Sequence, residues 1–319
     1  MGGYCVFCRQ ALPCATNPQL LPARAAFLTM PFVTTPDNVR LHYEETGAGT
    51  PIVFVHEFLG EVGAWEAQMR YFSRRYRCIA FNSRGYPPSD VPEGIEAYSF
   101  EHQRAGILAV LDGLSIEKAH IVGLSMGAFA TFYFGMQWPE RAISLTMAGV
   151  GSGSMPATRA QFKAESEAAS ASLLRDGWEK AAHARTLTPT RVQLRNKNPR
   201  GFEEFVGMVS RHSAKGSALT LAGYQALRPS MQDFRAQSMA SAVPALIICG
   251  DEDEPCLDAS LDLKRHMPSA GLAFMPNTGH ACNLEEPDLF NRLCEDFFHQ
   301  VESGQYRLRD PLARTSRIL

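Results

Sequence analysis

The sequence lacks any apolar run close to the roughly 18 to 20 residues that a transmembrane helix needs. It also lacks an excess of charge of one sign, because 31 Lys and Arg residues face 33 Asp and Glu residues. Such a chain has no large positive field to hold a nucleic-acid backbone or an anionic membrane. The one dense basic run, Arg70 to Arg77, lies at a predicted helix end just before a strand, which favours a solvated helix terminus over a nucleic-acid patch. We expect a soluble protein with no nucleic-acid partner and no membrane partner.

Acidic residues are absent from positions 1–29, and Pro13, Pro18 and Pro22 interrupt the apolar stretch that a signal peptide needs. We expect residues 1–29 to be a disordered N-terminal extension, with a weak transit peptide as the alternative. The segment that opens at Met30 has the character of an ordinary domain start. The extension therefore need not belong to the working protein.

The eight cysteines do not form the pattern of a disulfide framework. Several of them, such as Cys78 and Cys249, lie inside apolar stretches, where a free thiol packs as a small hydrophobic group. A reducing, cytoplasmic setting is therefore expected. Near the N-terminus no further Cys or His completes a four-ligand zinc set with Cys5, Cys8 and Cys14, so we expect no metal.

The hydrophobic pattern predicts an α/β fold with a doubly wound, mostly parallel sheet of about eight strands. Residues Phe32 to Glu45 predict a two-stranded antiparallel hairpin at the edge. Six short apolar runs follow, as expected for strands buried on both faces: Ile52–His56, Cys78–Phe81, Ala119–Gly123, Ser144–Ala148, Ala245–Cys249 and Leu272–Met275. Segments of helical period separate most of them: Val62–Ser73, Ser99–Gly113, Ser125–Gln137 and Leu257–His266, with Pro287–Val301 at the end.

The alternation of strands and helices stops after Ala148 and resumes near Val243. Between them no convincing strand occurs, and amphipathic stretches dominate. We therefore predict a catalytic domain made of residues 30–150 and 243–303, with residues 151–242 inserted as a helical cap. Such a cap shapes the substrate pocket and excludes water, so substrate choice should depend on it. The Arg-rich tail, residues 304–319, is expected to be loosely ordered.

The strongest chemical signal is Gly123-Leu124-Ser125-Met126-Gly127, directly after an apolar strand and directly before a helical segment. In this context a GxSxG sequence predicts a sharp turn that presents the serine at the carboxyl edge of the sheet. The start of the following helix favours developing negative charge there. Ser125 is therefore the candidate nucleophile, and a plain strand-to-helix turn is the alternative.

A serine hydroxyl needs a base, and His280 is the candidate because it follows a late strand in a loop and has a glycine before it. A carboxylate must then orient the imidazole. Asp251 and Asp253 both follow the apolar strand that ends at Cys249. Asp253 lies further into the loop, so we favour it over Asp251, whose expected role is in the turn itself.

Several motifs in one order give the chain a resemblance to the α/β-hydrolase superfamily, from Phe32 to Val301, in an esterase or lactonase branch with a helical cap. Beyond the GxSxG sequence they are His56-Glu57-Phe58 with Trp65 after it, the loop Phe81 to Ser89, Trp138-Pro139-Glu140-Arg141, Gly250-Asp251-Glu252-Asp253 and Gly279-His280. The resemblance implies the triad Ser125, Asp253 and His280 in this chain order. It also implies that the backbone N–H groups of Phe58 and Met126 form the oxyanion hole.

Two departures from the family pattern stand out. Glu57 replaces a small glycine beside the oxyanion loop, which brings a negative charge close to where another develops. Its side chain either points into solvent or pairs with Arg84, or it selects the substrate. Glu57 is therefore a possible substrate-site residue, and Trp65 is another. The second departure is Tyr86-Pro87-Pro88 in place of Gly-x-Gly, where the prolines stiffen the loop.

The expected activity is hydrolysis of a small carboxylic ester, thioester or lactone through an acyl-enzyme at Ser125, with no cofactor. Serine at the turn argues against the dehalogenase and epoxide-hydrolase branches, which resemble this chain but place aspartate there. A carbon–carbon bond hydrolase or an enol-lactonase of the same fold is the alternative enzyme, because the fold does not separate these reactions. A slow-turnover small-molecule receptor or a cofactor-free peroxidase is the alternative from another class. The sequence leaves the oligomeric state open.

Overall fold

The computed structural model describes residues 1–3 and 31–314. Eight strands of the second range form one sheet in the order β1-β2-β4-β3-β5-β6-β7-β8. β2 is antiparallel to both β1 and β4, and the remaining neighbours are parallel. The strands are β1 (Phe32–Thr34), β2 (Arg40–Thr46), β3 (Thr50–Val55), β4 (Tyr76–Phe81), β5 (Ala119–Leu124), β6 (Ala142–Ala148), β7 (Ala245–Gly250) and β8 (Ala270–Met275).

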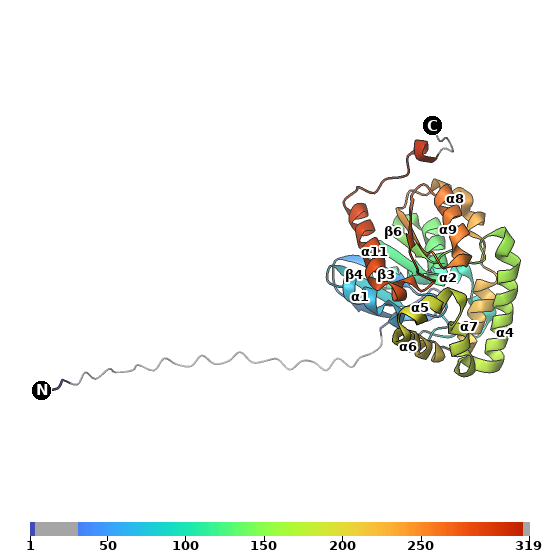
Figure 1. The fold of residues 1–319 in the computed structure, drawn as a ribbon, viewed down its shortest axis with the longest axis horizontal. Helices are drawn as coiled ribbons and strands as arrows, with labels where there is room; N and C mark the ends of the chain where they lie inside the picture. Colours follow the sequence, from blue (N-terminus) through green and yellow to red (C-terminus); the bar gives the residue numbers. More distant parts are fainter. Residues whose placement is uncertain (4–30, 315–319) are drawn as a thin grey trace. The chain divides into compact units, whose positions relative to one another are not determined.

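Helices cover both faces of this sheet, because alternate residues of each buried strand point to opposite sides. Val53 and Val55 of β3 belong to the same core cluster as the helices α2, α3 and α9. Ile52 and Phe54 belong to a second cluster with α1 and α11, which lie beside β3 and β4 in Figure 1. The helices are α1 (Glu66–Phe72), α2 (Phe100–Gly113), α3 (Met126–Gln137), α9 (Glu254–His266), α10 (Cys282–Glu285) and α11 (Pro287–Glu302). The predicted doubly wound, mostly parallel sheet is thereby confirmed.

Between β6 and β7 the described chain is helical. Its longest helix, α4, is interrupted at Gly177, where φ is 67°. A third apolar cluster joins these helices to the loops at the carboxyl edge of the sheet; it includes Leu59, Trp178, Phe205 and Ala281. The elements are α4 (Pro156–Thr186), η4 (Pro189–Arg191), α5 (Val192–Lys197), α6 (Pro199–Ser210), α7 (Ala214–Leu219), the π-helix η5 (Thr220–Gln225), η6 (Met231–Phe234) and α8 (Arg235–Ala240). The division into a catalytic domain and a cap stays a prediction.

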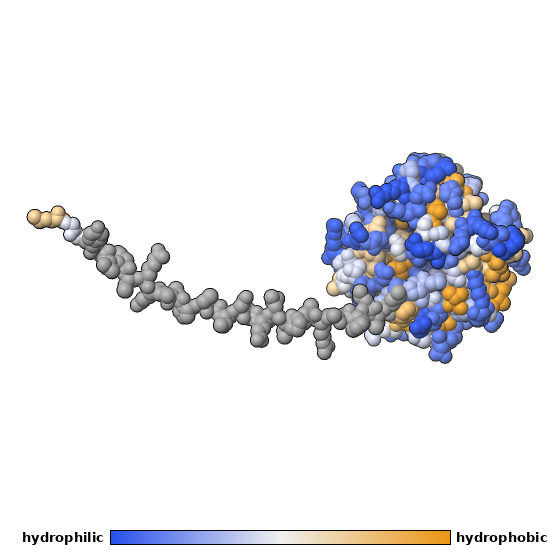
Figure 2. Space-filling view, turned by 90° about the horizontal axis from the view of Figure 1, so that it is seen from below, coloured by the Kyte–Doolittle hydropathy of each residue, from blue (hydrophilic) through white to orange (hydrophobic). Residues whose placement is uncertain are grey.

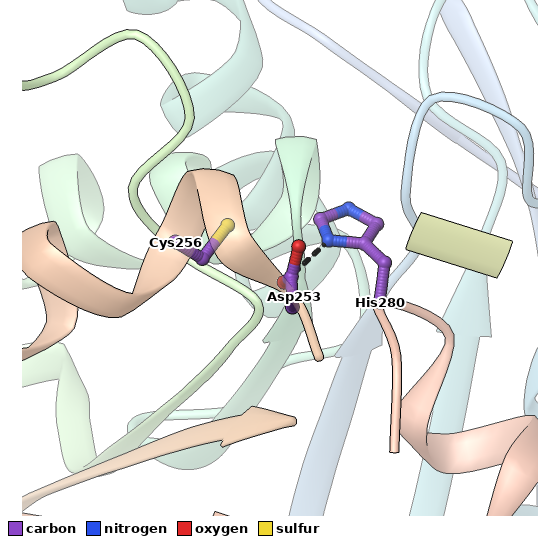
Figure 3. A group of neighbouring side chains, drawn as sticks. All are labelled: Asp253, Cys256 and His280. Carbon is purple, nitrogen blue, oxygen red and sulfur yellow. Dashed lines mark hydrogen bonds and ion pairs between the residues drawn. The ribbon is translucent and has the colours of Figure 1, made fainter. Parts of the chain in front are cut away.

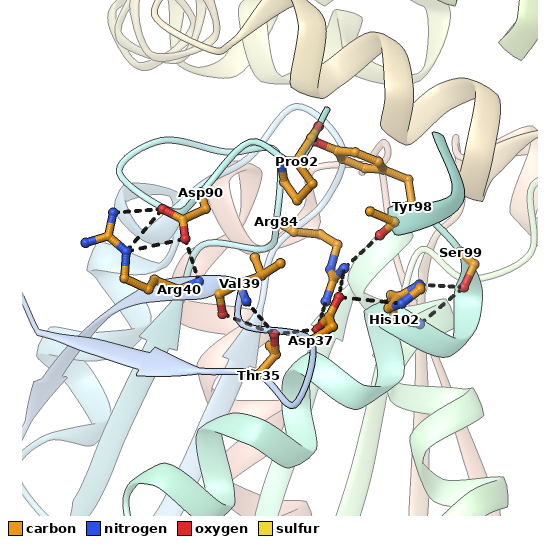
Figure 4. Close-up of polar contacts among 11 residues, drawn as sticks. Thr35, Asp37, Val39, Arg40, Arg84, Asp90, Pro92, Tyr98, Ser99 and His102 are labelled. Atoms are coloured by element: carbon orange, nitrogen blue, oxygen red, sulfur yellow. Dashed lines mark hydrogen bonds and ion pairs between the residues drawn. The ribbon is translucent and has the colours of Figure 1, made fainter. Parts of the chain in front are cut away.

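Arg84 anchors the loop after β4 to the β1–β2 turn. Its guanidinium, which is 2% exposed, donates to both carboxylate oxygens of Asp37 at 2.8 and 3.0 Å and to the carbonyl of Ala97 at 2.8 Å (Figure 4). Arg84 therefore has a structural partner, and the prediction that it pairs with Glu57 is wrong.

The region after α11 is held to the sheet at Tyr306. Its hydroxyl donates to the carbonyl of Ala245 at 2.8 Å, and its ring lies 5.0 Å from that of Phe297. Residues 4–29 of the predicted N-terminal extension, with the cysteines Cys5, Cys8 and Cys14, lie outside the described residues.

None of the helices in the described ranges has both the length and the apolar character to cross a membrane. Figure 2 shows one face of the molecule, where hydrophilic residues dominate and the hydrophobic ones gather in separate smaller areas.

Candidate active site

Ser125 lies on a strained turn between β5 and α3. Its φ of 53° and ψ of −113° are unusual for a residue with a side chain, and such strain costs about 1–3 kcal/mol. The flanking glycines make the turn possible. A Cβ on Gly127 would lie 2.1 Å from the carbonyl oxygen of Val55, and one on Gly123 would lie 2.3 Å from that of Gly127. The two glycines of the GxSxG sequence thus let the backbone pack closely here, and the resulting turn presents Ser125 at the edge of the sheet.

This edge is where the strand order reverses. β3 pairs with β4 on one side and with β5 on the other, although β4 follows β3 in the chain. Ligands of open α/β sheets bind at the carboxyl ends of the strands at such a switch point. Ser125 follows β5 directly, and the loop that begins with His56 follows β3.

His280 and Asp253 form the hydrogen-bonded pair at this edge. The Nδ1 atom of His280 lies 2.7 Å from the Oδ2 atom of Asp253, and both side chains are buried (Figure 3). A carboxylate partner accepts, so Nδ1 carries the proton and Nε2 is left to accept one. Asp251 is exposed and instead accepts from the N–H of Thr278 at 3.1 Å, in the turn after β7.

The pair shifts the pKa of each member. Burial lowers the pKa of His280, but the charge and hydrogen bond of Asp253 outweigh it, so this pKa is raised from 6.5. Burial raises the pKa of Asp253, and the neighbouring imidazole outweighs that effect, so the pKa of this carboxyl is lowered. Asp253 is therefore ionised beside a histidine that can hold a positive charge.

The adjacent residues Ala148 and Gly149, at the end of β6, lie between Ser125 and this pair. The Ser125 N–H donates to the carbonyl of Ala148 at 2.8 Å, and a Cβ on Gly149 would lie 3.2 Å from the imidazole of His280. Within the described chain no hydrogen bond joins the half-buried Ser125 hydroxyl to His280. Such contacts are often long before substrate binds.

Two buried tyrosines hold the residues expected to form the oxyanion hole. The hydroxyl of Tyr86 donates to the carbonyl of Phe58 at 2.8 Å, and that of Tyr224 donates to the carbonyl of Met126 at 3.2 Å. His56 fixes the same loop, because Nδ1 lies 2.7 Å from its neighbour's carbonyl and Nε2 accepts from the Ser83 N–H at 3.0 Å. The loop that contains Tyr86 thus supports the loop after β3.

Glu57 forms a buried ion pair with Arg191 of the η4 segment. The Glu57 side chain is 1% exposed and the Arg191 side chain 9%, so neither points into solvent. The predicted partner Arg84 and the solvent-exposed alternative are both wrong. The positive charge of Arg191 offsets the acidic side chain next to Phe58.

The η4 segment also holds the histidine loop. The N–H of His280 donates to the carbonyl of Thr190 at 2.7 Å, and a Cβ on Gly279 would lie 2.4 Å from that oxygen. The inserted helices therefore contact both the histidine loop and, through Arg191, the loop after β3.

Trp65 lies in the core. It is 1% exposed, and its ring lies 5.1 Å from Phe54 of β3 and 6.1 Å from Phe290 of α11. This packing assigns Trp65 to the layer between the sheet and α11 instead of to a substrate site.

Cys256 approaches the pair closely enough to suggest a metal-binding group with Asp253 and His280 (Figure 3). However, burial raises the pKa of the Cys256 thiol well above its usual value of 9.0, and its Sγ donates to the carbonyl of Gly149 at 3.3 Å. The thiol is thus engaged as a hydrogen-bond donor to Gly149, while Asp253 orients His280 through a hydrogen bond of its own.

Comparison with known proteins agrees with this geometry. Residues 50–287 match the family model for the alpha/beta hydrolase fold. The chain belongs to the α/β-hydrolase family. The predicted family is thereby confirmed, and the protein is a hydrolase enzyme.

Individual α/β-hydrolase relatives cover most of the chain. The 3-oxoadipate enol-lactonase 2 of Acinetobacter baylyi is 27% identical over 270 residues, which are 82% of this chain and 94% of that protein. The 2-hydroxy-6-oxononadienedioate/2-hydroxy-6-oxononatrienedioate hydrolase of Comamonas testosteroni is 27% identical over 277 residues, 82% and 91% of the two chains. The solved structure of a thermophilic esterase from Thermogutta terrifontis is similar in fold, with a TM-score of 0.75 at 23% identity over 85% of this chain and 98% of that one.

Proposed function

We propose that this α/β hydrolase cleaves a small carboxylic ester, thioester or lactone through an acyl-enzyme at Ser125, with no cofactor. The observation that carries the proposal is the buried 2.7 Å hydrogen bond between His280 Nδ1 and Asp253 Oδ2 beside the strained Ser125 turn. Because Nδ1 holds its proton against Asp253, Nε2 is free to take the proton of the serine hydroxyl.

The acylation step breaks one bond and forms another. The Ser125 Oγ attacks the carbonyl carbon while His280 Nε2 takes its proton, and Asp253 stabilises the imidazolium that forms. The tetrahedral intermediate collapses as its C–O bond to the leaving group breaks, or its C–S bond in a thioester, and His280 returns the proton to the leaving oxygen or sulfur. A water molecule then attacks the acyl-enzyme by the same route and releases the acid.

The N–H groups of Phe58 and Met126 stabilise the oxyanion in this proposal. Met126 is the first residue of α3, so its N–H has no acceptor within the helix. The peptide units that carry these N–H groups are held at their other ends, because the carbonyl of Glu57 lies 2.7 Å from His56 Nδ1 and that of Ser125 accepts from the Phe129 N–H at 3.0 Å. Tyr86 and Tyr224 hold the next peptide unit in each case, through the carbonyls of Phe58 and Met126. A preorganised donor of this kind contributes on the order of 10² to 10³ in kcat.

The helices between β6 and β7 act as the cap over this edge. Their contacts through Thr190 and Arg191 support the assignment, because the histidine loop and the loop after β3 both depend on them. Substrate choice then resides in residues 151–242.

An enol-lactonase or a carbon–carbon bond hydrolase is the second candidate. The relatives from Acinetobacter baylyi and Comamonas testosteroni, each at 27% identity over most of the chain, favour it. The same serine, histidine and aspartate would serve these reactions.

Ser125→Ala tests the proposal, with Ser152→Ala as a control that also removes one hydroxyl. Activity is measured on a series of acetate, butanoate and lactone substrates. Ser125→Ala is expected to lower kcat by on the order of 10³ or more with an unchanged thermal midpoint. Retention of more than about a tenth of the activity on every substrate would show that the nucleophile is misassigned.

A further inference from the structure

A buried arginine without a counter-ion lies near Ser125. The Arg228 side chain is 2% exposed, and its guanidinium lies over the ring of Phe129 at 3.8 Å and over that of Phe162 at 4.5 Å. Its Nη2 donates to the carbonyl of Ser152 at 2.6 Å. Among the residues that the structure describes, no carboxylate lies within ion-pair distance, and its Nε and Nη1 atoms are buried without a hydrogen-bond partner.

The position of Arg228 connects it to the reaction site on two sides. Phe129 follows Ser125 by one helical turn of α3, and its N–H donates to the Ser125 carbonyl at 3.0 Å. Residues four apart lie on the same side of a helix, about 6 Å apart along its axis. On the other side, Ser152 lies three residues after Gly149, which packs against His280.

The charge on Arg228 is costly where it lies. A guanidinium does not lose its proton at any ordinary pH, so burial cannot be relieved by deprotonation. Arg84 shows how the same chain satisfies a structural arginine, because it is equally buried and Asp37 holds it with two hydrogen bonds. A bound ligand with a negative charge would offset this cost, because it would supply the partner that the guanidinium lacks.

We propose that Arg228 binds a carboxylate of the substrate, so that the enzyme prefers esters or lactones whose far end is negatively charged. The proposal rests on the proposed reaction at Ser125. The guanidinium lies over the rings of Phe129 and Phe162, which cannot accept its N–H groups as an oxygen would, and its Nε and Nη1 atoms have no hydrogen-bond partner among the described residues. A carboxylate is the planar acceptor that fits such N–H groups.

The test uses ethyl half-esters of succinic, glutaric and adipic acids. Each is compared with the ester that carries a terminal carboxamide in place of the carboxylate. The wild type is expected to prefer the carboxylate in kcat/KM by on the order of 10² at the best chain length, because a buried charge pair is formed. Arg228→Met should remove most of this preference, and Arg228→Lys should keep part of it. Arg84→Met, the matched buried arginine, should lower the thermal midpoint but leave the preference unchanged.

Two results would overturn the proposal: a wild type with no preference for the carboxylate at any chain length, or an Arg228→Met variant that keeps the preference. The measurement on the wild type needs no variant, so the proposal can still be refuted if Arg228→Met does not fold. Calorimetric binding of the half-esters to Ser125→Ala separates this proposal from the catalytic one. Binding that is stronger for the carboxylate than for the carboxamide supports the Arg228 site even if Ser125 is not the nucleophile, and equal binding contradicts it.

Discussion

The ion pair between Glu57 and Arg191 offers a quantitative test of how the inserted helices are joined to the site. Arg191→Met removes the only ion-pair partner that the described residues give to Glu57. One carboxylate oxygen, Oε1, already lacks a hydrogen-bond partner, so the variant leaves the whole carboxylate unpaired at 1% exposure. Because both side chains are buried, solvent does not screen the attraction between the two charges. Loss of one partner of such a pair costs about 3–5 kcal/mol of stability. The thermal midpoint should fall by roughly 10 °C.

The double variant Glu57→Gln/Arg191→Met removes both charges and serves as the control. It should recover most of the lost stability, because a neutral pair of similar volume avoids the desolvation cost. Activity at 25 °C should follow the same order, because unpaired Glu57 disfavours an oxyanion at Phe58.

Urea unfolding and steady-state hydrolysis are measured on four proteins: the wild type, Glu57→Gln, Arg191→Met and the double variant. A coupling energy of about 2–3 kcal/mol between the two changes is expected. If the two single effects simply add, the pair does not act as a buried charge pair and the reasoning fails.

Two further changes test the site more narrowly. Asp253→Asn should lower kcat by about 10⁴, while Asp251→Asn, whose carboxylate accepts from backbone N–H groups in the turn such as that of Thr278, should cost much less. Asp253 raises the pKa of His280, and catalysis needs the neutral imidazole, so Asp253→Asn should also move the acid limb of the kcat/KM profile to lower pH. If Asp251→Asn lowers kcat more than Asp253→Asn does, Asp251 is the orienting acid. Gly127→Ala would force a Cβ to 2.1 Å from the Val55 carbonyl and should cost about 3 kcal/mol of stability. Gly207→Ala in α6, with its nearest atom at 3.9 Å, should instead stabilise by about 0.5–1 kcal/mol, and equal effects would contradict the packing argument.

The sheet could be predicted from the sequence because its strands are short apolar runs separated by helical periods. β5, predicted over Ala119–Gly123, spans Ala119–Leu124, and α3 begins at Met126, one residue after the expected start. Ser125, Asp253 and His280 can be singled out from the sequence because each follows a strand in a motif whose backbone geometry is local, and the structure brings Asp253 and His280 together. Asp253 follows β7 and His280 follows β8, and the parallel pairing of these two strands brings the loops after them together. The alternation of strands and helices in the sequence also predicts this pairing.

The contacts from the inserted helices could not be predicted. Arg191, Tyr224 and Arg228 belong to no motif, and their partners lie far away in the chain. Glu57 shows the limit most clearly, because the sequence places a charge beside Phe58 but does not identify its partner, and Arg84 is the nearer candidate along the chain. That arginine was already held by Asp37, and only the path of the η4 segment brings Arg191 to Glu57.

The central claim is a covalent acyl-enzyme at Ser125. Rapid quenching of the enzyme with a slowly hydrolysed ester, followed by digestion and mass spectrometry, tests it directly. An added acyl group is expected on the peptide that contains Ser125, formed at least as fast as turnover and absent from Ser125→Ala. An acyl group on another residue such as Cys256, or turnover with no adduct on any peptide, would contradict it.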